Sequence, residues 1–105
     1  MRIADVLKQA DINEGMRDFR KTKDAVLLDV RTAWEYGEGH IPGSGNIPLQ
    51  DIGLMAGNPE KDVPLFVYCQ SGARSRKAAS LLKYMGYRNV SDIGGIAAYE
   101  GMLVR

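Results

Sequence analysis

The sequence predicts a single α/β domain with a mostly parallel central sheet flanked by helices on both faces. Two short apolar runs without polar alternation, at residues 25–30 and 64–68, are typical of strands buried on both faces. Segments with helical spacing of apolar residues alternate with these strands, as in a parallel sheet covered on both sides. A length of 105 residues suits one domain, and the sequence contains no internal repeat or Ser/Gly-rich linker.

The expected elements of the N-terminal half follow from apolar spacing and from helix-breaking residues. Residues 3–10 carry apolar side chains at helical spacing, which predicts a short amphipathic helix. Asn13 is the expected N-cap of a second helix, with Met16 and Phe19 on one face. The Gly and Pro residues between positions 37 and 48 exclude a long regular element there.

The expected elements of the C-terminal half begin with a helix near Ser75. Gly86 lies where a left-handed C-terminal cap is expected, and residues 89–93 predict another short strand. A final helical piece is expected after Gly94 and Gly95. The apolar face of the helix near Ser75 is marked by Ala78, Leu81, Leu82 and Met85.

Composition excludes several classes of protein. The chain has one Cys, Cys69, and one His, His40, so structural zinc sites and iron–sulfur clusters within one chain are excluded, and we expect no metal or cofactor. A net charge of +1, from 14 basic and 13 acidic residues, gives no electrostatic reason to expect nucleic acid or acidic membranes as partners. Residues 1–10 lack the apolar run of a signal peptide, and no stretch approaches the roughly 20 apolar residues that cross a bilayer. We therefore expect a cytoplasmic protein.

The most informative segment follows the second buried strand. There, Cys69-Gln70-Ser71-Gly72-Ala73-Arg74 leads into a helix, and parallel sheets bind ligands just beyond the carboxyl ends of their strands. Such a loop can direct backbone N–H groups at an anion, and small residues leave its centre open. The helix N-terminus, worth up to about 2 kcal/mol, and the positive charge of Arg74 would both favour the nucleophilic thiolate. A lone Cys is otherwise often a small buried apolar residue, but this context favours a reactive one.

Two further cations, Arg76 and Lys77, lie in the first turn of the predicted helix. Basic residues are unfavourable there by a few tenths of a kcal/mol each. They could attract an anionic substrate or an acidic partner, or they could form a solvated positive face.

The Cys69 loop and several other segments together resemble the rhodanese family of sulfurtransferases. The Gly94-Gly95 pair is similar to the C-terminal glycine pair of that family. The upstream match consists, in the order expected for the family, of Leu28-Asp29-Val30-Arg31, Glu35-Tyr36, Gly39-His40-Ile41-Pro42-Gly43 and Asn46-Ile47-Pro48-Leu49. One departure is Tyr99, at a position where the family often carries Trp.

The resemblance implies a single rhodanese-like domain over residues 1–105, with residues 1–11 as an N-terminal addition. It implies that Cys69 takes a sulfane sulfur from thiosulfate or another small anionic donor, forms a persulfide and passes the outer sulfur to a thiol or a cyanide-like acceptor. A protein of a sulfur relay is a further expected partner. The cradle for the persulfide and the donor would be formed, mainly through backbone N–H groups, by Gln70, Ser71, Gly72, Ala73 and Arg74.

The resemblance and the residue pattern leave two alternatives open. One is a persulfide carrier or binding module that a partner protein feeds, because a carrier needs the same nucleophile and cradle. The other is a cysteine-dependent phosphatase or an arsenate reductase, but only four residues separate Cys69 from Arg74, where the phosphatase pattern has five. His40, Asp29 and Arg31 are interpreted as structural residues of their turns.

Overall fold

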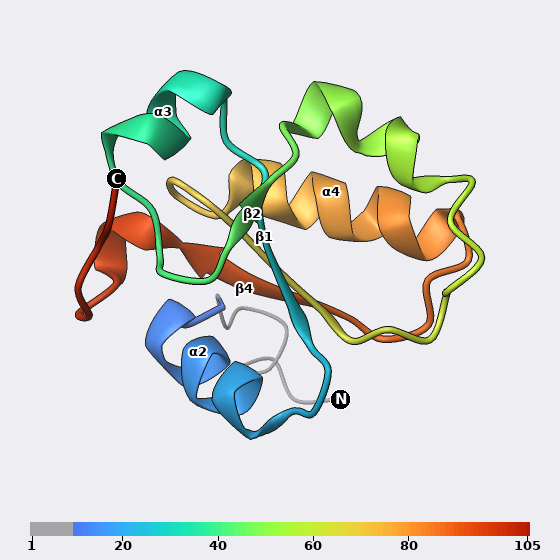
Figure 1. Ribbon diagram of the computed structural model, residues 1–105, viewed down its shortest axis with the longest axis horizontal. Coiled ribbons are helices and arrows are strands. Elements are labelled where there is room, and N and C mark those ends of the chain that lie inside the picture. Colours follow the sequence, from blue (N-terminus) through green and yellow to red (C-terminus); the bar gives the residue numbers. More distant parts are fainter. Residues whose placement is uncertain (1–9) are drawn as a thin grey trace, which may run out of the picture.

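The computed structural model describes residues 10–105 as a parallel sheet with helices on both faces, which confirms the predicted fold class. The strand order is β2-β1-β3-β4. Helix α2 covers one face, and α4 with the 3-10 helix η1 covers the other (Figure 1). The elements in chain order are α2 (Ile12–Lys21), β1 (Val26–Asp29), α3 (Ala33–Glu38), β2 (Gly45–Asn46), η1 (Leu49–Met55), β3 (Leu65–Cys69), α4 (Ala73–Tyr84), β4 (Val90–Gly95) and η2 (Ile96–Ala98).

Strand β3 divides the apolar interior into two cores. All five of its residues are buried, as expected for a central strand of a parallel sheet. Leu65, Val67 and Cys69 belong to the core under α4 and η1, whereas Phe66 and Tyr68 belong to the core under α2. Because side chains alternate along a strand, this register directs the Cys69 sulfur toward α4.

The N-cap of helix α2 lies two residues before the expected one. The Asp11 side chain accepts a hydrogen bond from the Asn13 backbone N–H at 3.0 Å, so Asp11 is the N-cap and the prediction of Asn13 was wrong. Asn13 lies inside the helix, where its side chain donates to the carbonyl oxygen of Ala98. The helix predicted at 3–10 lies outside the described residues, apart from Ala10, which is not helical.

Helix α4 begins at Ala73, two residues before its expected start, and it buries most of the predicted face. Ala78 and Leu82 are fully buried, and Met85 packs against the same core. Leu81 is 40% exposed, so its assignment to the buried face was wrong, whereas Ser75 and Ala79 are buried in addition. Gly86 has φ +101°, which confirms the left-handed cap expected there.

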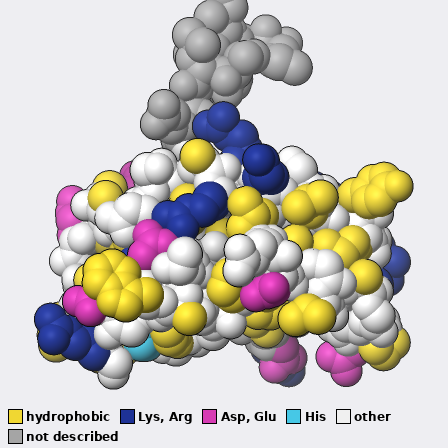
Figure 2. Space-filling model, turned by 90° about the horizontal axis from the view of Figure 1, so that it is seen from above, with side chains coloured by type: hydrophobic (Ala, Val, Ile, Leu, Met, Phe, Trp, Pro, Cys, Tyr) yellow, Lys and Arg dark blue, Asp and Glu magenta, His cyan; other side chains and the backbone are white. Residues whose placement is uncertain are grey.

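Several large apolar side chains remain on the surface. The most exposed are Trp34 at 74%, Leu54 at 82%, Tyr84 at 91% and Met102 at 81%. On the face seen in Figure 2, hydrophobic side chains are interspersed with both basic and acidic ones. Within residues 10–105, every helix is too short or too polar to cross a membrane.

Candidate active site

Cys69 is the last residue of β3 and lies at the carboxyl edge of the sheet, as predicted. The residue is only 1% exposed. Its sulfur accepts a hydrogen bond from the Gly72 backbone N–H at 3.0 Å and lies 3.6 Å from the Ser75 hydroxyl oxygen. The loop therefore folds back over the sulfur that begins it.

The surroundings of Cys69 favour the thiolate. Burial acts to raise the pKa of the thiol, because a charge in a poorly hydrated site is unfavourable. Hydrogen bonds from the Ser75 hydroxyl and from the backbone N–H groups of Ser75, Gly72 and Ser71 outweigh burial and hold the pKa of Cys69 below its ordinary value. The sulfur lies at the N-terminal end of α4, where the helix dipole also favours negative charge.

Two glycines allow the loop to take this path. Gly72 has φ +103°, a left-handed conformation that L side chains rarely adopt. Gly95, at the end of β4, lies so close to the loop that an added Cβ would be 2.5 Å from the Gln70 carbonyl oxygen and 2.7 Å from the Ser71 Cα. The glycine pair singled out in the sequence thus lets β4 approach the backbone around Cys69.

Arg74, which the sequence assigned to the cradle, is paired with α3. Its guanidinium group donates to the two carboxylate oxygens of Glu35 at 2.7 Å and 2.9 Å. Glu35 also closes a capping box with Thr32 at the start of α3. The Arg74 contact is the main reason why the pKa of Glu35 falls to about 2. The pair connects the first turn of α4 to α3 across the site.

The other predicted cradle residues lie at the surface of the loop. Gln70, Ser71 and Ala73 are exposed, and Gly72 is half-buried. The Gln70 side-chain oxygen accepts a hydrogen bond from Arg31 at 3.3 Å. Among the cradle residues, Ser71 and Gly72 thus direct backbone N–H groups at the sulfur. The Gln70 side chain is bound to Arg31 after β1, and the Arg74 side chain is bound to Glu35 on α3.

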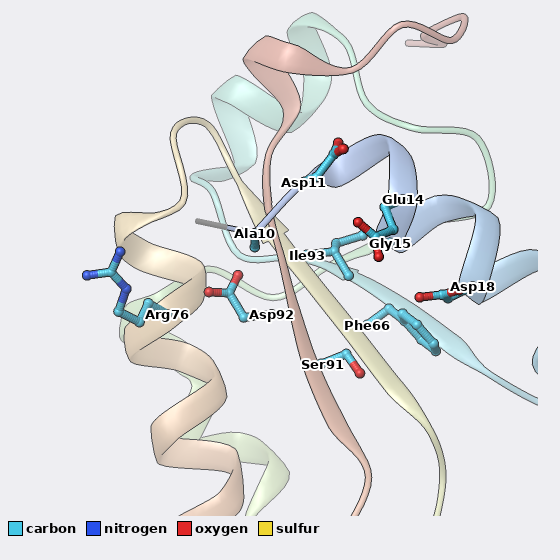
Figure 3. A pocket seen from close by; sticks show the side chains of 10 residues that line it. All are labelled: Ala10, Asp11, Glu14, Gly15, Asp18, Phe66, Arg76, Ser91, Asp92 and Ile93. Carbon is cyan, nitrogen blue, oxygen red and sulfur yellow. The ribbon is translucent and has the colours of Figure 1, made fainter. Parts of the chain in front are cut away.

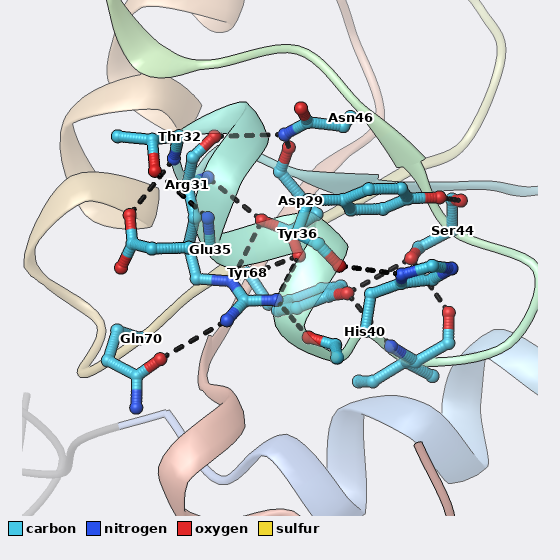
Figure 4. Close-up of polar contacts among 12 residues, drawn as sticks. Asp29, Arg31, Thr32, Glu35, Tyr36, His40, Ser44, Asn46, Tyr68 and Gln70 are labelled. Carbon is cyan, nitrogen blue, oxygen red and sulfur yellow. Dashed lines mark hydrogen bonds and ion pairs between the residues drawn. The ribbon is translucent and has the colours of Figure 1, made fainter. Parts of the chain in front are cut away.

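The loop after β1 contains a buried ion pair (Figure 4). Arg31 donates from Nε and Nη2 to the Asp29 carboxylate, and Nη2 also donates to the Gly39 carbonyl oxygen at 2.7 Å. The Asp29 carboxylate additionally accepts from the Arg31 backbone N–H at 2.8 Å. These contacts agree with the structural interpretation of Asp29 and Arg31.

Within residues 10–105, the recorded contacts of His40 are structural ones. Its Nδ1 donates to the Tyr36 carbonyl oxygen at 2.9 Å, and its ring stacks on the Tyr36 ring with centroids 3.7 Å apart. Its backbone pairs with Val104. Residues 10–105 contain no group of three or more His, Cys, Asp or Glu side chains that could hold a metal ion.

Ser75 was predicted only as the start of a helix, but its side chain lies at the site. It is fully buried, and its hydroxyl donates to the Asp92 carboxylate at 2.7 Å. A Ser in the first helical turn, six residues after Cys69, was the available signal. Asp92 comes from β4, and nothing in the sequence indicates that this strand lies next to α4.

A groove of about 390 Å³ lies beside the Cys69 loop. It is lined, among others, by Arg31, Glu35, Glu38, Gln70, Tyr99 and Leu103. Arg76 and Lys77 are exposed on α4 and do not line this groove. If an anionic substrate binds in this groove, Arg76 and Lys77 are therefore not placed to contact it directly.

The family model of the rhodanese-like domain matches residues 13–102. The chain belongs to the rhodanese family. A sulfurtransferase from Allochromatium vinosum is 38% identical over 79 residues, which cover 74% of each chain. A thiosulfate sulfurtransferase from Escherichia coli, PspE, is 35% identical over 71 residues, 66% of this chain and 68% of that protein.

Longer proteins contain a similar rhodanese domain, and solved structures share the fold. A candidate sulfur carrier protein from Bacillus subtilis, YrkF, is 36% identical over 67 residues, 64% of this chain and 36% of that protein. The solved structure of a rhodanese with anions from E. coli is similar with a TM-score of 0.69 and 31% identity, covering 77% of this chain and 98% of that one.

Proposed function

We propose that this rhodanese-family protein is a sulfurtransferase in which Cys69 accepts a sulfane sulfur from thiosulfate or another donor and passes it to a thiol or a cyanide-like acceptor. The observation that carries the proposal is the hydrogen bond of 3.0 Å from the Gly72 N–H to the Cys69 sulfur, at a site that lowers the pKa of the thiol. A relative named as a thiosulfate sulfurtransferase supports thiosulfate as the donor.

The reaction consists of two displacements at sulfur. The Cys69 thiolate attacks the outer sulfur of thiosulfate, a new S–S bond forms, and sulfite leaves with the electron pair of the broken S–S bond. The acceptor then attacks the outer sulfur of the Cys69 persulfide. The S–S bond to Cys69 breaks, and its electron pair returns to the Cys69 thiolate.

The loop would stabilise negative charge on sulfur at both stages. Backbone N–H groups from Ser71, Gly72 and Ser75 surround the thiolate and are fixed before the reaction, so they need no reorganisation as charge moves. Gln70, Ala73 and Arg74 complete the proposed cradle. Because Arg74 is bound to Glu35, we assign it the closing of the loop by tying α4 to α3.

A second candidate is a persulfide carrier that exchanges sulfur with a partner protein. The groove of about 390 Å³ beside the loop is large for thiosulfate and could accept the chain end of a protein. The similarity to a candidate sulfur carrier also favours this alternative. Enzyme and carrier share the Cys69 persulfide and differ in the donor and acceptor.

A phosphatase or an arsenate reductase is a weaker candidate. Such enzymes grip an oxyanion with an Arg side chain directed at the nucleophile. Here the Arg74 guanidinium group donates from both terminal nitrogens to the two carboxylate oxygens of Glu35. The loop is also one residue shorter than the phosphatase pattern.

A single-turnover experiment tests the proposal. Thiosulfate added to the protein without acceptor should release one sulfite per chain, and cyanide added afterwards should yield one thiocyanate per chain. The matched variant Cys69→Ser should release neither product. No sulfite release from thiosulfate, together with one thiocyanate per chain after a persulfide-loaded partner protein replaces thiosulfate and is removed, would favour the carrier. Hydrolysis of a phosphate ester in place of sulfur transfer would contradict both.

A further inference from the structure

The Ser75 hydroxyl lies between the Cys69 sulfur and the Asp92 carboxylate. Its oxygen is 2.7 Å from Asp92 Oδ1 and 3.6 Å from Cys69 Sγ, and the residue is fully buried. Two carbonyl oxygens are further acceptors for this hydroxyl, that of Gly72 at 3.1 Å and that of Gly94 at 3.4 Å. The proposed sulfur transfer makes no use of Asp92.

A serine hydroxyl has one hydrogen, so these acceptors compete for it. The Asp92 contact is the shortest, and a hydrogen bond to a carboxylate is roughly twice as strong as one to a neutral acceptor. When Cys69 is a thiol, the competition has a simple outcome. The S–H group donates to Ser75 Oγ, and the Ser75 hydroxyl donates to Asp92.

The competition changes when Cys69 loses its proton. A thiolate has no hydrogen to donate, so it can hydrogen-bond to Ser75 only if the hydroxyl turns its hydrogen from Asp92 to the sulfur. Asp92 Oδ1 would then keep only the Gly94 backbone N–H, at 3.0 Å. The carboxylate and the thiolate are therefore rival acceptors of one hydrogen.

We propose that Asp92 is a positioning residue for Cys69, which acts by competing with the Cys69 thiolate for the hydroxyl hydrogen of Ser75 and so weakens the hydrogen bond from Ser75 to the sulfur. The Ser75 hydroxyl then stabilises the negative charge less than it would without Asp92, and the backbone N–H groups of the loop supply the rest. This has a chemical benefit, because each additional stabilising interaction makes a thiolate a weaker nucleophile. Its use in sulfur transfer rests on the proposed function, whereas the competition for the hydrogen does not.

Other charged groups surround the pair and must be separated from this effect. Figure 3 shows the Asp92 carboxylate between β4 and α4, at a pocket of about 430 Å³. Arg76 on α4 lines the same pocket. The acidic residues of the pocket on α2 and next to it are Asp11, Glu14 and Asp18. On the side of the sulfur, Arg74 is paired with Glu35 and Asp29 with Arg31. A bare charge effect of Asp92 would reach Cys69 through space, with or without Ser75.

A double-mutant cycle on the acidity of Cys69 separates the two effects. Asp92→Asn keeps an oxygen for the Gly94 N–H but removes the charge, and Ser75→Ala removes the hydroxyl. Since Cys69 is the only Cys, its rate of alkylation by iodoacetamide can be followed against pH without interference. We expect Asp92→Asn to lower the pH midpoint of the alkylation rate, so that the proton concentration at the midpoint rises about threefold. Ser75→Ala should move it to higher pH, and the double variant should match Ser75→Ala.

The same experiment can overturn the proposal. An equal downward shift from Asp92→Asn in both backgrounds would assign the effect to charge alone, and no shift or an upward one would contradict the competition. If Ser75→Ala does not fold in buffer, all variants are measured in the presence of a stabilising osmolyte such as sucrose. The rate of the fully deprotonated thiol should fall about twofold in Asp92→Asn, which a purely structural residue would not cause. Because alkylation needs no sulfur donor, failure of the proposed function would leave this result readable.

Discussion

The loops after β1 and β3 lie at the same edge of the sheet, but they stabilise charge in different ways. After β1, Arg31 and Asp29 neutralise each other in a buried pair. After β3, backbone N–H groups with one hydroxyl surround the Cys69 sulfur. The first arrangement leaves no capacity for a new anion, whereas the second stabilises one that forms on the sulfur. This difference agrees with the proposed function, in which the loop after β1 supports the site and the loop after β3 carries the reacting sulfur.

The largest expected effect is on stability, from the loop after β1. Arg31→Ala leaves the Asp29 carboxylate, which is 0% exposed, without its counterion, and should lower the free energy of unfolding by about 3–5 kcal/mol. Urea denaturation measures this. The matched control is Arg88→Ala, which breaks an exposed ion pair with Asp62 and should leave the midpoint unchanged. Asp29→Asn combined with Arg31→Met should recover much of the loss, because no buried charge remains. A small effect of Arg31→Ala would contradict the claim that Asp29 depends on Arg31 as its counterion.

The next effect is on reactivity, from the loop after β3. Gly72→Ala strains a backbone at φ +103° by about 1–2 kcal/mol and should move the N–H away from the Cys69 sulfur. Losing that hydrogen bond should raise the pKa of Cys69 and slow its alkylation at neutral pH by about tenfold.

Gly86→Ala is the matched control for Gly72→Ala. Gly86 has φ +101° and follows α4, at the end remote from Cys69, so its substitution strains the backbone equally. It should lower stability by a similar amount and leave alkylation of Cys69 unchanged. Equal loss of reactivity in both variants would show that strain, and not the lost N–H, is the cause.

The smallest expected effect comes from the ion pair between Glu35 on α3 and Arg74 on α4. Glu35→Gln should lower stability at neutral pH by about 1 kcal/mol, since the pair with Arg74 is partly exposed and screened by solvent. The pKa of Glu35 is lowered to about 2 in the folded protein, so its contribution is present above the ordinary pKa of Glu. The difference between wild type and variant should therefore shrink as pH falls from about 4.5 toward 2. A difference in stability that stays constant over this pH range would contradict the role given to the ion pair.

The sequence predicted what depends on local pattern. Apolar runs predicted strands β1 and β3, Gly86 predicted the end of α4, and Cys69 was expected at the carboxyl end of its strand. The exposure of Leu81 was missed because its spacing fits the apolar face equally well, and only tertiary packing decides which of these side chains is buried.

The contacts that the sequence did not predict join residues far apart in the chain. Arg74 meets Glu35 and Ser75 meets Asp92, at separations of 39 and 17 residues. Such pairs depend on which strands are neighbours, and a single sequence contains no direct signal of that order. Backbone N–H donors around the sulfur were expected from the loop as a whole, but the particular donor, the Gly72 N–H, was not, because every residue type except Pro provides one.

The most direct test of the account is the mass of the intact protein after treatment with thiosulfate, for the wild type beside Cys69→Ser. We predict that the wild type gains the mass of one sulfur atom, that cyanide removes it, and that Cys69→Ser, with an unchanged circular dichroism spectrum, gains none. An equal gain on Cys69→Ser would contradict the account. So would the absence of any gain on the wild type from both thiosulfate and a small persulfide donor.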